Sequence, residues 1–367
     1  MENAEKQIPE NSRILDRRTR DEFKIVSFSS YKRTEVKNQL LVNLVNGKVE
    51  PSCYWTAELI CSGHYMDIWE IILLFIGKYI HLGNPKLPIY VEKRFLIFRN
   101  IMMQGLFYDE LQLRNHSVIR ELFAEIISIL AISPKKHSVD AIKIDRIEEF
   151  DMTKMPERLK APSVKYAEPF FQKEDPKELW IAVNEFAYQL TAEENHPPDN
   201  MSACYWIEWV IEFEQICKTR KQPCRLERRT KVPVEYKHQL DLVWLLWDAV
   251  FFIAAEKSTF LKKVVDSIFQ LFCIQYTPGT PKKRRYLLYF AVSLLTEPIQ
   301  SVEMISNKQQ IEVVINQIHT IYRQIKKNEH TPNLDYLYNG LESQSNLEKT
   351  IHKMEILGNM NLFPTKN

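Results

Sequence analysis

The sequence predicts an all-α fold in which two similar multi-helix lobes are joined by an extended linker. Glycine is scarce, with 8 residues in a chain of 367, whereas 45% of the residues are hydrophobic, enough to build large cores. Apolar residues recur with helical periodicity in one segment after another. The order of these segments then repeats once along the chain, which is the reason for expecting two lobes.

The first lobe is expected over residues 34–132, after a flexible, largely polar N-terminal arm at 1–33. Start and stop signals delimit its first two helices, one that ends at Gly47 and one that begins at Pro51 and ends at Gly63. Three further segments carry an apolar stripe at helical spacing, and they cover residues 69–80, 87–104 and 118–132.

Residues 133–176 lack a sustained period and contain prolines and many charges, which predicts an extended linker that lies against a lobe. The second lobe, with a basic insertion, is expected over residues 177–327. Its last helix is predicted at 308–327, where isoleucine and valine form one broad face. Residues 328–367 are expected to form a weakly ordered C-terminal tail.

Matching segments support the prediction of two lobes. Cys-Tyr-Trp occurs at 53–55 and 204–206, and Phe-Ala occurs at 123–124 and 290–291. The two spacings differ by about 16 residues, which an insertion after Cys217 in the second copy explains. An internal duplication and a chance likeness between helices of similar composition both account for this pattern.

No motif of a common catalytic or cofactor site is present in the sequence. The phosphate-binding patterns GxxxxGK[ST] and GxGxxG are absent, as are HExxH and GxSxG. The six cysteines form no CxxC pair and are expected to be reduced and buried. The spacing of Cys217, Cys224 and His238 does not fit a zinc site. We therefore expect a protein that has no cofactor or metal and is not an enzyme.

A few polar groups are candidates for acid–base chemistry, and a structural role is the preferred interpretation for each. His64, His81, Asp67 and Glu70 lie near predicted helix ends, where such residues commonly cap helices or face water. Asp248 lies among tryptophan and phenylalanine residues, so burying it without a partner would be costly. We expect a lysine or arginine of the basic insertion to neutralise it.

The candidate functional site consists of two clusters of positive charge in the second lobe. The formal net charge is only +2, so nucleic-acid binding would depend on local clusters. The first cluster comprises Lys218, Arg220, Lys221, Arg225, Arg228, Arg229 and Lys231. The second comprises Lys282, Lys283, Arg284 and Arg285. If both clusters lie on one face, they form a patch for phosphate groups or for an acidic partner.

Other interpretations of this charge stay open. Solvated loops and nuclear-import signals are also rich in lysine and arginine. No aromatic residue lies within the first cluster, so stacking on nucleobases is not expected. The chain lacks a long uninterrupted apolar run, which predicts no membrane span and an intracellular protein.

Segments of both lobes resemble an uncharacterised protein family of nucleocytoplasmic large DNA viruses, the giant viruses. The resemblance covers about residues 50–300 and is carried by SCYWTAELICSGHYMDIWEIILLFIGKYIHLGNPKLPIY, SACYWIEWVIEFEQICK and KKRRYLLYFAVSLLTEP. It implies a viral setting in the host cytoplasm, viral factory, nucleus or virion, and it transfers no site residues.

From the charge clusters and this resemblance we expect a binding or assembly protein with a protein or nucleic-acid partner. It would act as a replication or packaging accessory or as a virion component. The alternatives are a purely structural protein–protein scaffold and an enzyme of unrecognised type.

Overall fold

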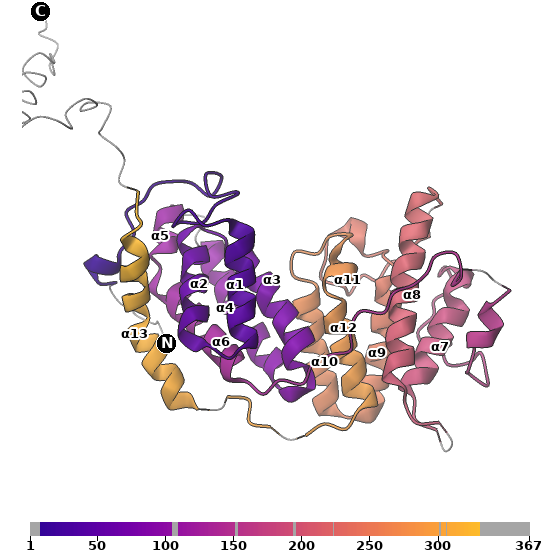
Figure 1. The fold of residues 1–367 in the computed structure, drawn as a ribbon. Coiled ribbons are helices and arrows are strands. Elements are labelled where there is room, and N and C mark those ends of the chain that lie inside the picture. The colour runs from indigo at the N-terminus through magenta and orange to yellow at the C-terminus, as the bar shows by residue number, and fades with distance from the viewer. Residues whose placement is uncertain are drawn as a thin grey trace, which may run out of the picture.

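The computed structural model describes residues 8–104, 109–150, 153–193, 196–222, 224–300, 302–305 and 307–330. Every regular element within these residues is helical, so the all-α prediction is confirmed (Figure 1). The α-helices are α1 (Arg33–Val45), α2 (Val49–Cys61), α3 (Tyr65–Phe75), α4 (Leu87–Gln104), α5 (Glu110–Arg114), α6 (Ser117–Ile132), α7 (Trp180–Leu190), α8 (Asn200–Thr219), α9 (Val243–Lys257), α10 (Thr259–Phe272), α11 (Thr280–Lys283), α12 (Arg285–Thr296) and α13 (Lys308–Lys326).

Short helical turns complete the described elements: η1 (Glu10–Ser12), the π-helical turn η2 (Ile76–Ile80), η3 (His81–Gly83), η5 (Met155–Arg158), η6 (Lys177–Leu179) and η7 (Tyr236–His238). Among the described helices, none is both long and apolar enough to cross a membrane. The predicted C-terminal tail lies outside the described residues from residue 331 onward.

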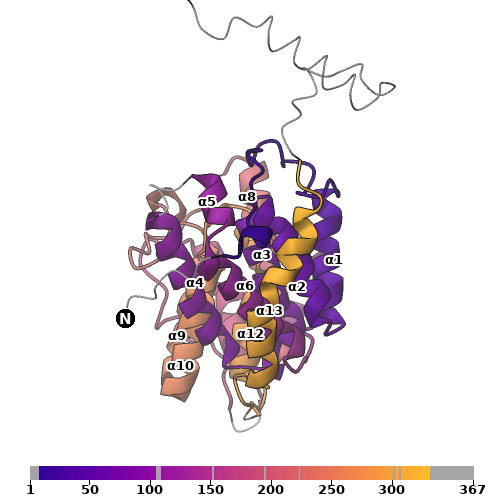
Figure 2. The ribbon, with the colours of Figure 1, turned by 90° about the vertical axis from the view of Figure 1, so that its left-hand side faces the viewer.

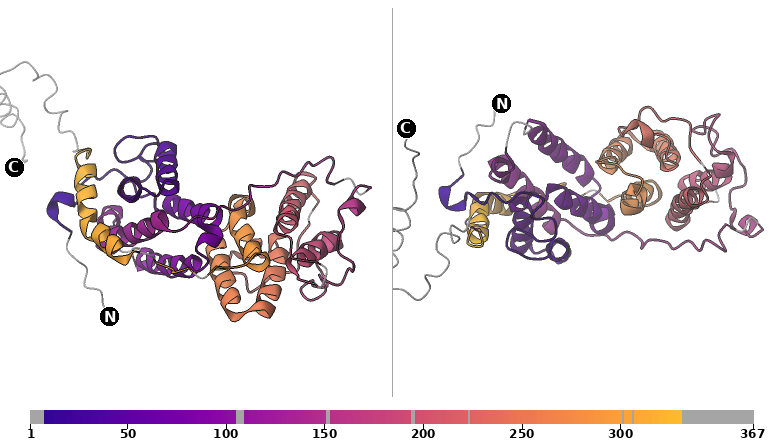
Figure 3. Two further views of the ribbon diagram at one scale, coloured as in Figure 1. Left: turned by 60° about the horizontal axis from the view of Figure 1, so that its bottom comes forward. Right: turned by 90° about the horizontal axis from the view of Figure 1, so that it is seen from above.

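The helices lie in two groups that share one hydrophobic core. The first group contains α1–α6 and α13, and the second contains α7–α12 (Figures 1 and 3). The groups meet where α4 packs against α10 and where η2 packs against α12. The buried apolar side chains of both groups form a single cluster, which includes Trp69 in the first group and Trp244 and Trp247 in the second.

Corresponding helices of the two groups have corresponding neighbours. α1 packs on α2 as α7 packs on α8, and α2 packs on α6 as α8 packs on α12. Cys53 and Cys204, the first residues of the repeated Cys-Tyr-Trp, are both buried. Equivalent neighbours do not test a common origin of the two groups, so the internal duplication stays a prediction.

The last helix, α13, returns to the first group although the sequence placed it within the predicted second lobe at 177–327. It packs against α6 and α2 (Figure 2). The Arg120 guanidinium lies 3.8 Å from the centroid of the Tyr322 ring. Burial is limited to one stripe of α13, namely Ile311, Ile318, Ile321, Tyr322 and Ile325. The periodicity therefore predicted the helix correctly, but it carries no information about which group the apolar face covers.

The segment before α1 is packed against the first group from residue 8 onward, which differs from the expected flexible arm at 1–33. Phe23 and Phe28 are fully buried. The Ser27 hydroxyl donates a hydrogen bond of 2.6 Å to the buried Glu58 carboxyl, and the Phe28 amide donates one of 2.8 Å to the Ser62 hydroxyl. A few aromatic anchors in a polar segment suffice to hold it on the surface of the helices.

In its described residues, the segment between α6 and α7 forms only short helical turns. It begins with hydrogen bonds from the Lys136 and Ser138 amides to η2 and then contacts the second group, and the sequence predicts a linker lying against a lobe at 133–176. The Phe150 ring stacks on Trp209 of α8, with 4.8 Å between ring centroids. The Asn184 side chain of α7 accepts a hydrogen bond of 2.9 Å from the Tyr166 amide. These contacts attach the linker to α7 and α8.

Candidate functional site

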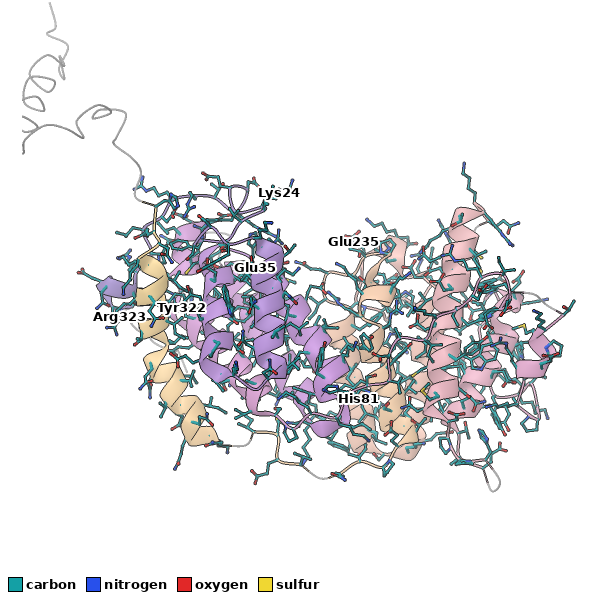
Figure 4. All side chains as sticks on the ribbon, in the orientation of Figure 1. Lys24, Glu35, His81, Glu235, Tyr322 and Arg323 are labelled. Carbon is teal, nitrogen blue, oxygen red and sulfur yellow. The ribbon has the colours of Figure 1, made fainter. Side chains whose placement is uncertain are left out.

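The first charge cluster belongs to the end of α8 and to the loop that follows it. We call residues 220–240, of which 223 lies outside the described residues, the basic loop. The loop folds back on itself, because the Leu226 amide donates to the Leu240 carbonyl and the Arg229 amide to the Gln239 carbonyl, each at 3.0 Å. It lies at the end of the second group where Glu235 is labelled (Figure 4).

Arg229 is buried, which corrects its prediction as a surface contact residue. Only 6% of it is exposed. Its guanidinium forms two hydrogen bonds with the Asp175 carboxylate, of 2.8 and 2.6 Å, and one of 2.7 Å with Asp248. The expectation that a cation of the insertion neutralises Asp248 is therefore confirmed. Burial raises the pKa of the Asp248 carboxyl, and its hydrogen bond with Arg229 opposes that effect.

Arg284 is also buried, with 4% exposure, and it joins the two helix groups instead of facing a partner. Its guanidinium forms an ion pair of 2.6 Å with Glu70 of α3. It also donates to the carbonyl groups of Phe272 and Ile274 at the end of α10. A cation at the carboxyl end of a helix is electrostatically favourable. This explains why a run of basic residues stands at the start of α12: Arg284, within that run, binds the carbonyl groups at the carboxyl end of α10.

The other cations of the second cluster are partly neutralised by α8. Arg285 forms an ion pair of 2.9 Å with the buried Glu208, which also accepts a hydrogen bond from the Tyr289 hydroxyl. Lys282 lies 3.5 Å from Glu212. In the first cluster, Lys218 pairs with Glu214 at 3.1 Å. The pairs with Glu208 and Glu212 hold α11 and the start of α12 beside α8. Pro278, just before α11, lines one cavity with Lys221 and Arg225, so the two clusters lie on neighbouring parts of the second group.

Several of the predicted cations remain exposed and form no ion pair within the described part of the chain: Arg220, Lys221, Arg225, Lys231 and Lys283. Arg228 is partly exposed and has no acidic partner there either, and its guanidinium lies over the ring of Tyr236. These side chains are the part of the predicted site that can meet a ligand.

A cavity of about 540 Å³ lies at the base of the basic loop. Lys221 and Arg225 line it together with Pro278, which precedes the second cluster. Its lining also contains Glu214 and Asp241, and burial raises the pKa of both carboxyls. The acidic groups thus lie in the more protected part of the cavity, whereas Lys221 and Arg225 are exposed to solvent.

Cys217, Cys224 and His238 line the same cavity. Among the described residues, no group of three or more histidine, cysteine or acidic side chains could hold a metal ion. Burial raises the pKa of the Cys217 thiol, and it raises that of Cys224 to about 12. Both thiols are therefore protonated at neutral pH and are poor nucleophiles.

A second cavity, of about 400 Å³, lies between the two helix groups. Phe95 and Phe98 of α4 line it on one side, and Pro233 of the basic loop lines it as well. Arg20 and Arg99 also line it, and both are exposed and form no ion pair with the described residues. The basic loop thus reaches two further cations of the first group, which the sequence did not connect with the site.

Most of the candidate acid–base groups have structural partners. His64 makes a hydrogen bond of 2.7 Å with the Phe23 carbonyl, and burial lowers its pKa. Asp67 pairs with Arg33 and Lys37, and Glu70 pairs with Arg284. That the protein is not an enzyme stays a prediction, since pairing does not test activity.

His81 differs from these groups. It is buried, and neither ring nitrogen makes a hydrogen bond of normal geometry with the described residues. It follows η2 with a φ of 48°, and its ring centroid lies 5.0 Å from that of Phe290 on α12. Burial lowers the pKa of His81 to about 4, although the nearby Glu297 carboxylate, paired with Lys136, raises it. A neutral imidazole thus lies at the contact between the two groups (Figure 4).

We expect His81 to lower the free energy of unfolding as the pH falls from about 6.5 to 4. The unfolded chain takes up the proton at the ordinary pKa of 6.5, whereas the folded protein resists it, so the stabilisation is present above pH 6.5 and is lost below it. The shift to about 4 corresponds to roughly 3 kcal/mol. Urea unfolding of the wild type and His81→Asn at several pH values measures the loss, since asparagine tolerates positive φ.

The comparison between these two proteins isolates His81 from other titrating groups. Burial raises the pKa of the Glu58 and Glu208 carboxyls, which favours the folded state as the pH falls, but it does so in both proteins. Equal pH slopes in the wild type and the variant would contradict the assignment.

Comparisons with known proteins give no relative for this chain: no family model, no curated protein and no solved structure matches it.

Proposed function

We propose that this chain is a non-enzymatic binding and assembly protein that holds a nucleic acid on the exposed cations of the basic loop and α11. The supporting observation is a set of exposed cations in the second group that have no ion pair with any described residue, namely Arg220, Lys221, Arg225, Lys231 and Lys283. The neighbouring carboxylates of α8 already have basic partners, so they do not compete for these five side chains.

A phosphate backbone fits this arrangement better than a single small anion. The exposed cations without an ion pair among the described residues come from residues 220–231 and from α11, and of the five only Lys221 and Arg225 line the cavity at the base of the loop. Spread cations suit a polymer with regularly spaced charges, whose binding releases counterions. A role in replication or packaging in a large DNA virus, or as a virion component, is the setting that we propose for this activity.

The proposal predicts that reversing exposed cations of the basic loop weakens nucleic-acid binding without unfolding the protein. In a variant with Lys221→Glu, Arg225→Glu and Lys231→Glu, we expect affinity at about 0.1 M salt to fall at least about tenfold. The slope of log affinity against log salt should become shallower by about 0.7 to 0.9 for each lost phosphate contact. Fluorescence anisotropy with labelled single-stranded and duplex oligonucleotides at several salt concentrations measures both quantities.

The matched control reverses three exposed lysines elsewhere, Lys262, Lys263 and Lys308. Lys262 and Lys263 lie in the first turns of α10, whereas Arg284 binds the opposite, carboxyl end of that helix. Lys308 is the first residue of α13, which packs on the first group. The control has the same change in net charge, so it is expected to keep most of the affinity. Failure of the wild type to bind either oligonucleotide at about 50 mM salt would overturn the proposal, and binding that persists at high salt would favour the scaffold alternative.

A further inference from the structure

The fold places an exposed aromatic ring in the basic loop, which the sequence did not predict. Tyr236 is 71% exposed. The guanidinium carbon of Arg228 lies 3.3 Å from the centroid of its ring, and the Arg228 side chain also donates a hydrogen bond to the Tyr236 carbonyl. The two residues are separated in the sequence, but the fold of the loop brings them together.

We infer that Tyr236 and Arg228 form a stacking platform for an unpaired nucleobase, so that the ligand is a single-stranded nucleic acid. This inference rests on the proposed function and names its substrate class. Every base has a flat π-face that can stack on a tyrosine ring or on a guanidinium plane, whatever its sequence. In a duplex the bases are stacked on one another, so a surface platform of this kind selects single strands.

The platform is held in place by the interior of the protein. Arg229, next to Arg228, is fixed by its hydrogen bonds with Asp175 and Asp248. The loop is also closed by the hydrogen bond of 3.2 Å that the Gln239 side chain donates to the Val232 carbonyl. A ring that is already positioned loses little conformational freedom when a ligand binds.

The basic loop that carries the platform also contains further cations. Lys231 lies in the same loop, and Lys221 and Arg225 line the cavity at its base. Through Pro233, the loop reaches the cavity between the helix groups, where Arg20 and Arg99 are unpaired within the described part of the chain. The phosphates of a strand bound at Tyr236 are therefore assigned to these cations.

The test compares Tyr236→Ala with the wild type on three probes of similar charge: a dT oligomer of about 12 nucleotides, an abasic oligomer of the same length and a short duplex. We expect Tyr236→Ala to lower affinity for the dT oligomer about 5- to 100-fold and to change affinity for the abasic oligomer and the duplex less than about twofold. The salt slope should not change, since no phosphate contact is lost. Tyr236→Phe, which keeps the ring, should restore tight binding of the dT oligomer.

The outcomes separate this inference from the proposed function. If Tyr236→Ala binds the dT oligomer like the wild type while the reversed variant Lys221→Glu, Arg225→Glu, Lys231→Glu loses it, the stacking platform is wrong and the proposed function stands. Equal affinity of the wild type for the dT and abasic oligomers would also overturn the platform. If the wild type binds none of the three probes at about 50 mM salt, both fail. Because Tyr236 is exposed, the urea midpoint of Tyr236→Ala should equal that of the wild type.

Discussion

Replacing Arg229 with methionine is expected to lower the free energy of unfolding by about 3 to 5 kcal/mol. The Arg229 guanidinium is the basic partner of Asp175, whose side chain is fully buried, and of the partly buried Asp248. Methionine fills a similar volume but leaves both carboxylates without a counter-charge, and an unpaired buried charge is among the most costly defects in a protein interior. Urea or guanidinium unfolding followed by circular dichroism measures the loss.

A combined variant separates the lost charge pairing from lost packing. With Asp175→Asn and Asp248→Asn added to Arg229→Met, no unpaired charge is left, and we expect most of the stability to return. Arg225→Met, at an exposed position of the same loop, should stay within about 0.5 kcal/mol of the wild type. A loss below about 1 kcal/mol in Arg229→Met would contradict the view that this arginine is structural.

Several of the longer helices could be predicted from the sequence because each of them carries an apolar stripe of its own. The segments expected at 87–104 and 118–132 correspond to α4 (Leu87–Gln104) and α6 (Ser117–Ile132), and the segment at 308–327 corresponds to α13 (Lys308–Lys326). Helical periodicity shows that the apolar face of a helix is buried, but it does not show which part of the protein packs against that face. For that reason neither the return of α13 to the first group nor the shared core of the two groups could be predicted.

The candidate site was predictable as a region but not residue by residue. The expensive burial of Asp248 correctly indicated that a cation of the insertion would pair with it. The same argument does not show which cation, so the sequence prediction groups Arg229 with the exposed cations of the cluster. The sequence does not connect Tyr236 with the site, because Tyr236 follows the charge cluster and comes to lie against Arg228 through the folding back of the basic loop.

Gly77→Ala is expected to destabilise the contact between the two helix groups by about 1 to 3 kcal/mol, and more if the backbone cannot shift. Gly77 lies in η2, which packs against α12. A Cβ atom at Gly77 would come within 2.8 Å of the carbonyl carbon and 2.9 Å of the carbonyl oxygen of Tyr286, and within 3.1 Å of the Leu287 amide nitrogen. All three atoms belong to the backbone of α12, so no side-chain rotation relieves the overlap.

The same substitution at Gly279 is the matched control, since a Cβ atom there meets no other atom within 4 Å. Its φ is −88°, so alanine is tolerated and should change stability by no more than about 1 kcal/mol, in the stabilising direction. Urea unfolding of the two variants distinguishes a general effect of losing a glycine from the clash at the contact between the groups. Because η2 and α12 join the groups, Gly77→Ala should also increase hydrogen exchange at the α12 amides. If neither the exchange nor the stability changes, the two groups can separate at this contact without cost.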